Sequence, residues 1–586
     1  MKKLFLSAIA VVLAGGAYAI PNTFSEGEIV SAEKMNANFQ HLEQQLQGAI
    51  EKAVNCAAGE KIADAIANGY TNITVSGTCT ENLQFSMWRE DSAENGTPTG
   101  KLAPRFLKLT GADANAKIVD GSSNTESTLS VNSGATLFLE NITVSGGEYG
   151  VNAQRNSNLY LSGVTVENFT ESGIRVADSA WLGIDDDGAT LAGTGAGNGI
   201  NLATGSSGWI STITISDVDR GIRVAGGSMV YLKGYSISAA SRGISIDNSR
   251  VLKYGDGSAS IEGTSDRAVS VSQGVFTNWE GTLEIKNLSG GRGLDFWMSQ
   301  GNIHNLKMPD YDNTGSDWNP ALSIGGGSSV NINGAEISAS TDGALVSISD
   351  GSITEIREST LTVGNAAAGI EASGSSRLNF RNSTISGSVT DSLVNVSEGS
   401  SAKIEDSSTL TITSAENGLR VAGNSRLNFR NSTISGTVTD NLVSVSNGSS
   451  ADVRDSTLSG TVTDGGLVSV DAGSSAEVRD ATLTLESGNR TVGVSDSSDL
   501  TIRSSTLSGT ATEELVDLRR ISNVIIRNES KLSQSGSDTP DVRVSNLSML
   551  SIRNEEASIN KVDCYSKGYV SANEGIVTTL SESCTE

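Results

Sequence analysis

The twelve residues SRLNFRNSTISG stand at positions 376–387, and the same twelve residues recur at 425–436. The two copies begin forty-nine residues apart, which is two steps of about 24.5 residues. Self-similarity at a step of 20–50 residues is the signature of a solenoid, in which each repeat packs only on its neighbours. The repeated string therefore predicts a chain built from stacked units of about 24 residues.

A short apolar-x-apolar pattern recurs at this step through most of the chain. The steps run from 22 to 28 residues and average about 24. The first apolar residues of the eighteen copies are Leu129, Val151, Ile174, Ile200, Ile222, Ile244, Val269, Leu294, Leu322, Val346, Ile370, Val394, Leu419, Val443, Val468, Val492, Val516 and Val542.

Each repeat contains three short alternating segments. After the first apolar residue, here Ile370, apolar residues recur at offsets 8 and 10, as Leu378 and Phe380, and at offset 15, as Ile385. Such alternation indicates a strand with one buried face. Three strands per repeat, separated by polar corners, predict an all-β fold: a single-stranded parallel β-helix of about 18 or more coils.

The corners carry residues that tolerate left-handed backbone angles. We expect stacked amides at offset 12 to hydrogen-bond from coil to coil, as in other stacked sheets. The Asn and Asp residues at this offset are Asn141, Asp186, Asp256, Asn382, Asp406, Asn431, Asp455, Asp480, Asn528 and Asn554.

The repeats, together with NCAAGEKIADAIANGYTNITVSGTCTENL at 55–83, resemble the right-handed parallel β-helix of the pectin-lyase-like superfamily. The resemblance covers roughly 55–560 and implies a right-handed coil whose first end is capped by a helix and a strand. It implies no particular activity, because this fold hosts lyases, hydrolases, adhesins and spikes.

The first nineteen residues read as an export signal. Lys2 and Lys3 precede the apolar run LFLSAIAVVLAGG, and Ala17-Tyr18-Ala19 fits a cleavage site. No later stretch is long and apolar enough to span a bilayer. We expect a protein that is secreted or held at the cell surface, with the periplasm as the alternative.

The four cysteines form one local pair near each end of the chain. Under oxidising conditions Cys56–Cys79 and Cys564–Cys584 are the natural disulfides, although four cysteines allow three pairings. We expect each to pin a cap: an N-terminal cap with the first coils at 56–128, the β-helix proper at 129–560, and a C-terminal cap at 561–586.

Residues 20–55 contain a heptad seam. From Ala32 the apolar residues alternate in steps of three and four, which predicts a short α-helix. Residues 32–53 either form a coiled coil that makes an oligomer, such as a trimer, or lie as an amphipathic helix on the first coil. The seam residues are Met35, Phe39, Leu42, Leu46, Ala49 and Ala53.

Charge and composition exclude several functions. The formal net charge is −26, or −28 once Lys2 and Lys3 leave with the signal, so we expect no nucleic-acid partner. Only two histidines occur, His41 and His304, and they assemble no Ser-His-Asp triad. The Gly-His-Gly and Arg-Ile-Lys motifs of polygalacturonases are missing, so the sequence favours a non-enzymatic protein without settling the question.

Two strings resemble calcium sites. GGRGLDFWM at 290–298 fits a Ca²⁺-binding nonapeptide that works only in many copies, and the acidic run Asp185-Asp186-Asp187 lies at a corner. A chance match and a solvated turn are the simpler interpretations. We expect no cofactor and no metal site, with Ca²⁺ as the alternative.

One region departs from the repeat. Phe276, Phe296 and several other aromatic residues gather between 276 and 318, next to the longest step of the series. Exposed rings and carboxylates there would suit a sugar, and the alternative is that the rings fill a wider core, which we expect for Phe276 and Phe296. The glycan candidates are Trp279, Trp297, Asp310, Tyr311, Asp312, Asp317 and Trp318.

Arginines recur at offset 11, where side chains should face outward. Asp452, Glu477, Asp455 and Asp480 lie close enough in sequence to neutralise them. The alternative is a track for an anionic polysaccharide, since arginine binds carboxylate or sulfate bidentately. This arginine ladder is Arg357, Arg381, Arg430, Arg454, Arg479, Arg503, Arg527 and Arg553, interrupted by Glu405.

Taken together, the sequence favours an exported, non-enzymatic β-helix rod that binds a glycan or a partner surface. The first alternative is a polysaccharide lyase or glycoside hydrolase with its site near 276–320. The second is a structural spacer.

Overall fold

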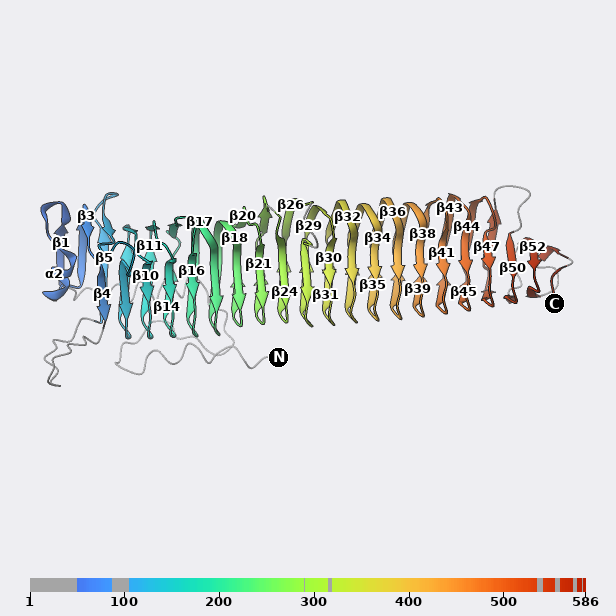
Figure 1. Ribbon diagram of the computed structural model, residues 1–586, viewed down its shortest axis with the longest axis horizontal. Coiled ribbons are helices and arrows are strands. Elements are labelled where there is room, and N and C mark those ends of the chain that lie inside the picture. Colours follow the sequence, from blue (N-terminus) through green and yellow to red (C-terminus); the bar gives the residue numbers. More distant parts are fainter. Residues whose placement is uncertain are drawn as a thin grey trace. The chain divides into compact units, whose positions relative to one another are not determined.

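The computed structural model describes residues 50–86, 105–288, 290–314, 319–534, 541–553, 559–572, 577–581 and 583–585. The chain divides into two compact units, Met1–Leu232 and Lys233–Glu586. In each unit the coils contribute first, second and third strands to three parallel columns of paired strands, here called the three sheets, and successive coils lie side by side (Figure 1). Among the described residues, the last coils contribute only first and second strands. The expected all-β solenoid is confirmed, with about 20 turns and almost no helix.

The unit Met1–Leu232 contains these strands. Its first sheet holds β4 (Leu83–Ser86), β7 (Leu129–Asn132), β10 (Tyr149–Ala153), β13 (Ser172–Val176), β16 (Asn198–Leu202) and the end of β17 (Ser207–Ala225). Its second sheet holds β1 (Glu51–Asn55), β2 (Asn72–Ser76), β5 (Phe106–Gly111), β8 (Thr136–Glu140), β11 (Asn158–Ser162), β14 (Trp181–Ile184) and the start of β17. Its third sheet holds β3 (Thr78–Thr80), β6 (Lys117–Val119), β9 (Thr143–Ser145), β12 (Val164–Glu167), β15 (Ala189–Ala192) and the middle of β17.

The first sheet of the unit Lys233–Glu586 begins in β18 (Met229–Asp247). It continues through β21 (Arg267–Ser272), β24 (Arg292–Trp297), β27 (Leu322–Gly325), β30 (Ala344–Ile348), β32 (Thr360–Ala372), β34 (Thr384–Val396), β36 (Thr409–Val421), β38 (Thr433–Val445), β41 (Gly466–Val470), β44 (Arg490–Val494), β47 (Val516–Leu518), β50 (Val542–Ser545), β52 (Ile559–Tyr565) and β54 (Val577–Leu580).

The other two sheets of this unit follow the same order. The second holds β19 (Arg250–Lys253), β22 (Val275–Asn278), β25 (Gln300–His304), β28 (Ser329–Asn333), β31 (Ile353–Arg357), β33 (Arg377–Arg381), β35 (Ser401–Glu405), β37 (Arg426–Arg430), β39 (Ser450–Arg454), β42 (Ser475–Arg479), β45 (Asp499–Arg503), β48 (Asn523–Arg527), β51 (Met549–Arg553) and β53 (Tyr569–Ala572). The third holds β20 (Ala259–Glu262), β23 (Leu283–Lys286), β26 (Leu306–Asn313), β29 (Glu336–Thr341), the first halves of β32, β34, β36 and β38, and then β40 (Thr457–Val462), β43 (Thr482–Gly488), β46 (Thr506–Ala511) and β49 (Lys531–Gln534).

The predicted register is confirmed within each unit. In the first sheet Ile370 is the partner of Val394, and Val394 is the partner of Leu419. All three side chains are buried, so each coil places its apolar residues directly over those of the coil before. The same holds from Leu129 to Ile222 in one unit and from Ile244 to Val542 in the other.

The N-terminal helix prediction is wrong where it can be compared with the structure. The signal at 1–19 and most of the heptad segment lie outside the described residues, but Glu51–Asn55 form strand β1. Ala53 pairs with Thr74 of β2 and is exposed, so it belongs to no helical seam. Pairing with β2 satisfies the backbone of these residues and lets Val54 point into the core.

A short helix does lie at the first end of the solenoid, as the resemblance implies. Helix α2 (Ile62–Ala67) buries Ile62 completely. The Glu81 carboxylate accepts hydrogen bonds from the amides of Ile62 and Ala63, at 2.8 and 3.0 Å, and so satisfies the helix's free N-terminal amides. None of the helices in the described part of the chain has the length and apolarity needed to cross a membrane.

Both predicted disulfides are present. Cys56–Cys79 joins the 3-10 turn η2 (Cys56–Ala58) to β3, and Cys564–Cys584 joins β52 to the last described residues. The coils continue beyond 560, because Val562 of β52 is the partner of Val542. The C-terminal disulfide therefore staples the last coils of the solenoid itself.

The corner residues behave as predicted in their backbone. Asn141, Asn382, Asp406, Asn431, Asp455, Asp480 and Asn528 have φ between 45° and 59°. Asp186 and Asp256 do not; in these turns Gly188, two residues after Asp186, and Gly255, next to Asp256, have the positive φ. Asn554 lies outside the described residues. Among the corners that the structure describes, the asparagines form no side-chain ladder.

Buried serines link the coils instead, which the sequence reading did not anticipate. In the turn between the first and second strands, the backbone N–H of each serine donates to the Oγ of the serine one coil later, at 3.0–3.2 Å. These serines are Ser299, Ser328, Ser352, Ser376, Ser400, Ser425, Ser449, Ser474 and Ser498. The sequence does contain a signal for this column, because most repeats have a serine six residues after their first apolar residue.

Replacing one of these serines should open the stack locally. Ser400→Ala leaves the buried N–H of Ser376 without its acceptor, which costs about 1–3 kcal/mol. We expect hydrogen exchange of the Ser376 amide to accelerate by about 5- to 100-fold. Ser401→Ala, which alters the neighbouring half-exposed side chain, is the control and should leave exchange unchanged. Equal exchange in both variants would show that the serine column does not hold the coils.

Candidate functional site

The candidates of the aromatic region that the structure describes do not come together in a single sugar site. Phe276 and Phe296 fill the core as expected, and Tyr311 is also buried. The Tyr311 hydroxyl lies 2.7 Å from the carbonyl oxygen of Gly291 and 2.8 Å from that of Asn319. Burial raises the pKa of Tyr311 to about 12. The proposal that Tyr311 stacks on a sugar is therefore wrong, because its ring is enclosed by the protein.

The acidic candidates of this region lie apart from the exposed tryptophans. Asp310 and Asp312 are exposed on β26 of the third sheet. Asp310 lies within an irregularity in the pairing of β26 with β29, and Asp312 follows it. The Asp312 carboxylate accepts hydrogen bonds from the backbone and side chain of Thr314, at 3.2 and 3.0 Å. Asp317 and Trp318 lie outside the described residues.

Trp279 and Trp297 are both exposed, at 56% and 47%, but they occupy different corners. Trp297 precedes β25, whereas Trp279 stacks on His304, the last residue of β25, with ring centroids 6.0 Å apart. The length of this strand, about 13 Å at 3.3 Å per residue, separates the two indoles. They cannot clamp one sugar ring between them.

Trp297 lies on the outer face of the first sheet. Along β24, Leu294 and Phe296 point inward, so Asp295 and Trp297 point outward. The partners of Trp297 on the neighbouring strands are Ser272 and Gly325. A Cβ on Gly325 would come within 3.0 Å of the indole. Glycine at 325 therefore lets one face of the Trp297 ring lie against the backbone, while the ring remains half-exposed.

A group of charges centres on Asp295, which precedes Trp297 by two residues on the same outward face of β24. Asp295 has one oxygen 2.9 Å from Arg292 Nη1 and the other 2.8 Å from Arg267 Nε. Arg292 Nη1 also donates to Ser323 Oγ at 3.4 Å. We call Arg267, Arg292, Asp295, Trp297 and Ser323 the Trp297 site. It combines an open apolar ring with fixed cations and a hydroxyl, which are groups that orient a polar ligand.

The arginines of this site belong to a column that the sequence reading missed. Arg242, Arg267 and Arg292 are register partners on three consecutive strands. Asp266 lies 2.5 Å from Arg242 and 3.8 Å from Arg267. Three arginines thus share two carboxylates and leave one positive charge. The signal in the sequence was an arginine two residues before the first apolar residue in consecutive repeats.

The arginine ladder is in register, but it is largely neutralised. Asp452 is ion-paired with Arg430 at 2.7 Å and with Arg454. Although burial alone would raise the pKa of Asp452, hydrogen bonds from the two arginines hold it below its usual value. The further pairs are Arg357–Glu355 (3.0 Å), Arg381–Asp406 (2.9 Å), Arg479–Asp480 (3.4 Å) and Arg503–Glu477 (3.6 Å). Within the described part of the chain, Arg527 and Arg553 have no such partner.

The two calcium-like strings have structural roles. In the acidic run, Asp185 accepts hydrogen bonds from the amides of Asp187 and Gly188, at 3.1 and 3.3 Å, and so closes a turn. Burial raises the pKa of Asp185. GGRGLDFWM contains the whole of β24, where Asp295 is held by arginines.

A second charged cluster lies buried near the last coils, and sequence reasoning did not find it. Glu514 and Asp517 are buried almost completely. Asp517 is ion-paired with Arg490 and Arg519, each at 2.7 Å, and Glu514 is ion-paired with Arg543. Burial and the nearby Asp517 charge raise the pKa of Glu514 to about 7. Gly466 and Arg490 occupy the same column as Glu514 in the two preceding coils. A buried carboxylate at this position therefore could not be predicted from the repeat.

Residues 320–483 match the family model of the right-handed β-helix region. The chain contains a right-handed β-helix. With the parallel register described above, this confirms the architecture that the resemblance implied. No curated protein matches the chain.

The pKa of Glu514 makes a prediction about stability. Because folding raises this pKa, the folded state binds an extra proton between about pH 4.5 and 7, and stability falls as pH rises through that window. Glu514→Gln should therefore stabilise the last coils at pH 8, by up to about 3 kcal/mol, and change little at pH 4.5. Chemical unfolding across this pH range measures the difference.

Glu513→Gln provides the matched control. Glu513 is the adjacent carboxylate, its side chain is 42% exposed, and its contact with Arg519 is 3.8 Å. It should show no such pH dependence. A gain for Glu514→Gln that is the same at pH 4.5 and pH 8 would contradict the account.

Proposed function

We propose that the protein is an exported, non-enzymatic β-helix that binds an acidic glycan at the Trp297 site. The observation that carries the proposal is the half-exposed indole of Trp297, which lies over Gly325 and next to the Arg267–Asp295–Arg292 group. An aromatic face of this kind packs on the apolar side of a sugar ring, while nearby polar groups set its orientation.

The charge of the site favours an acidic sugar. Arg242, Arg267 and Arg292 carry one more charge than Asp266 and Asp295 neutralise. Arginine binds carboxylate and sulfate groups through paired N–H donors. The negative group of a uronic acid or a sulfated sugar would therefore neutralise the remaining positive charge of the arginine column. The overall acidity of the chain makes such a local cationic site selective, because the rest of the surface repels anions.

The proposal of a binding protein rather than an enzyme rests on Asp295. Both of its oxygens are occupied by arginines, so this carboxylate is committed to holding the site's shape. A general acid or a nucleophile needs an oxygen within reach of the substrate. Secretion or cell-surface display is supported by two disulfides, which persist in oxidising compartments.

Glycan-array binding of the mature chain tests this function. We expect binding to uronic-acid or sulfated polymers, and Trp297→Ala should weaken it by at least about tenfold, as removal of a central tryptophan commonly does. Trp279→Ala is the matched control, because it removes an equally exposed tryptophan from the other corner. It should leave the affinity within about twofold.

Two outcomes would replace the proposal. Release of unsaturated products or new reducing ends from the bound polymer would make the protein a lyase or a hydrolase. Absence of binding to any glycan, or equal binding by Trp297→Ala, would favour the structural spacer.

A further inference from the structure

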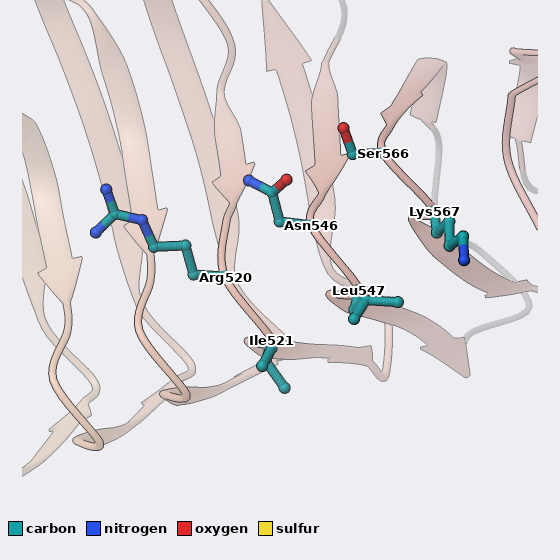
Figure 2. A pocket seen from close by; sticks show the side chains of 6 residues that line it. All are labelled: Arg520, Ile521, Asn546, Leu547, Ser566 and Lys567. Atoms are coloured by element: carbon teal, nitrogen blue, oxygen red, sulfur yellow. The ribbon is translucent and has the colours of Figure 1, made fainter.

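A surface groove of about 490 Å³ lies in the last coils of the unit Lys233–Glu586. It is formed by three consecutive turns between first and second strands, and Figure 2 shows its side chains on neighbouring turns. We call it the C-terminal groove, and its lining residues are Arg520, Ile521, Asn546, Leu547, Ser566 and Lys567.

Two apolar residues of the groove occupy strained backbone positions. Ile521 has φ of 65° and Leu547 has φ of 64°. In the equivalent turns of earlier coils this position is a glycine, such as Gly399, Gly448 or Gly473, or a small polar residue, namely Ser375, Asn424 or Ser497. A β-branched residue such as isoleucine rarely adopts this conformation. The last coils thus hold large apolar side chains where earlier coils have glycine, serine or asparagine, so these two turns present apolar surface that the earlier turns lack.

These side chains belong to an exposed apolar patch. Ile521 is 64% exposed, Leu547 49%, Met549 46% and Tyr569 39%. Met549 and Tyr569 are register partners on β51 and β53. In the preceding coils the same outward column holds the polar residues Ser475, Asp499 and Asn523. The column therefore changes from polar to apolar at Met549. A contiguous apolar patch with a polar surround is typical of a binding surface.

The charges at the groove restrict what it binds. Arg520 lies at one side, paired with Asp496 at 3.0 Å, and Lys567 lies at the other. Within the described part of the chain, Lys567 has no ion pair. Two grooves facing one another would bring these cations together, so self-contact of the groove is disfavoured. The charges favour an occupant that is both apolar and acidic.

The chain itself contains a segment of this chemistry. Residues 20–49, which precede strand β1, include Phe24, Ile29, Phe39 and Leu42. They also include four glutamates and one lysine, a net charge of −3. We infer that the C-terminal groove binds residues 20–49 of a neighbouring copy. Because the donor segment and the acceptor groove are different surfaces, the contact is heterologous and repeats from copy to copy.

Two variants of the full mature chain separate donor from acceptor. Ile521→Gly with Leu547→Gly empties the groove, and it restores the residue that earlier coils use, so folding is not at risk. Phe39→Ser with Leu42→Ser disables the segment. Light scattering of the wild-type chain should show a mass that rises with concentration and falls with added salt. Each variant alone should remain monomeric.

Mixing the two variants gives the decisive result. One variant keeps a working segment and the other keeps a working groove, so an equimolar mixture should form a dimer and stop there. Met298→Gly, which removes a 48% exposed side chain from another turn with positive φ, is the control and should associate like the wild-type chain.

Three results would overturn the inference. Association of the groove variant at wild-type strength would assign self-assembly to the heptad seam alone. A mixture that stays monomeric would show that segment and groove do not meet. A wild-type chain that stays monomeric but binds phosphatidylglycerol vesicles, with binding lost in the groove variant, would assign the groove to a membrane surface.

Discussion

The structure depends on one constraint: every coil must present the same pattern of apolar and hydrogen-bonding groups to the coil before it and the coil after it. The columns Ile370–Val394–Leu419 and Ser376–Ser400–Ser425 show the two halves of this constraint. The first removes apolar surface from water, and the second satisfies buried N–H groups that a tight turn leaves without a strand partner. A residue that breaks either column disturbs two interfaces at once, which is why the sequence repeats so faithfully.

Because the repeat is so regular, the positions that depart from it are the ones where we look for functional residues. Trp297 replaces a small outward residue, and Gly325 in the next coil makes room for its ring. Glu514 puts a buried carboxylate into the column that holds Gly466 and Arg490 in the two preceding coils, and three arginines pair with it and Asp517. Ile521 and Leu547 stand where earlier coils have glycine, serine or asparagine. Each departure adds a cost to the stack, whether of burial, charge or backbone strain, and those at Trp297, Ile521 and Leu547 also expose apolar side chains.

Much of the fold was predictable from the sequence because its signals are periodic. The apolar columns, the outward arginines and the left-handed corner at Asn382 all follow from position within a 24-residue unit. Both disulfides followed from cysteine spacing and export. The end of the heptad segment was mispredicted because Ala53 fits a helical seam as well as it fits an exposed strand position, and only the partner strand β2 decides between them.

The site was less predictable, because its chemistry depends on which residues become neighbours one coil apart. The sequence left open whether the ring of Tyr311 is exposed. In the structure the ring is buried, and its hydroxyl donates to the carbonyl oxygens of Gly291 and Asn319. Arg267 and Arg292 stand twenty-five residues apart in sequence and converge on Asp295 only through the register of β21 and β24. Offsets within a repeat predict which face a side chain occupies, but ion pairing depends on side-chain length and direction at that face.

The register of the coils can be measured directly with pairs of spin labels on the second sheet. Ser329 is in one column with Ser401, Ser450 and Asp499, which follow it by three, five and seven coils. At about 4.8 Å per coil, labels on Ser329 and each of these positions should lie about 14, 24 and 34 Å apart, increasing linearly. Distances that do not increase in proportion to the number of coils would contradict the stacking on which every other conclusion depends.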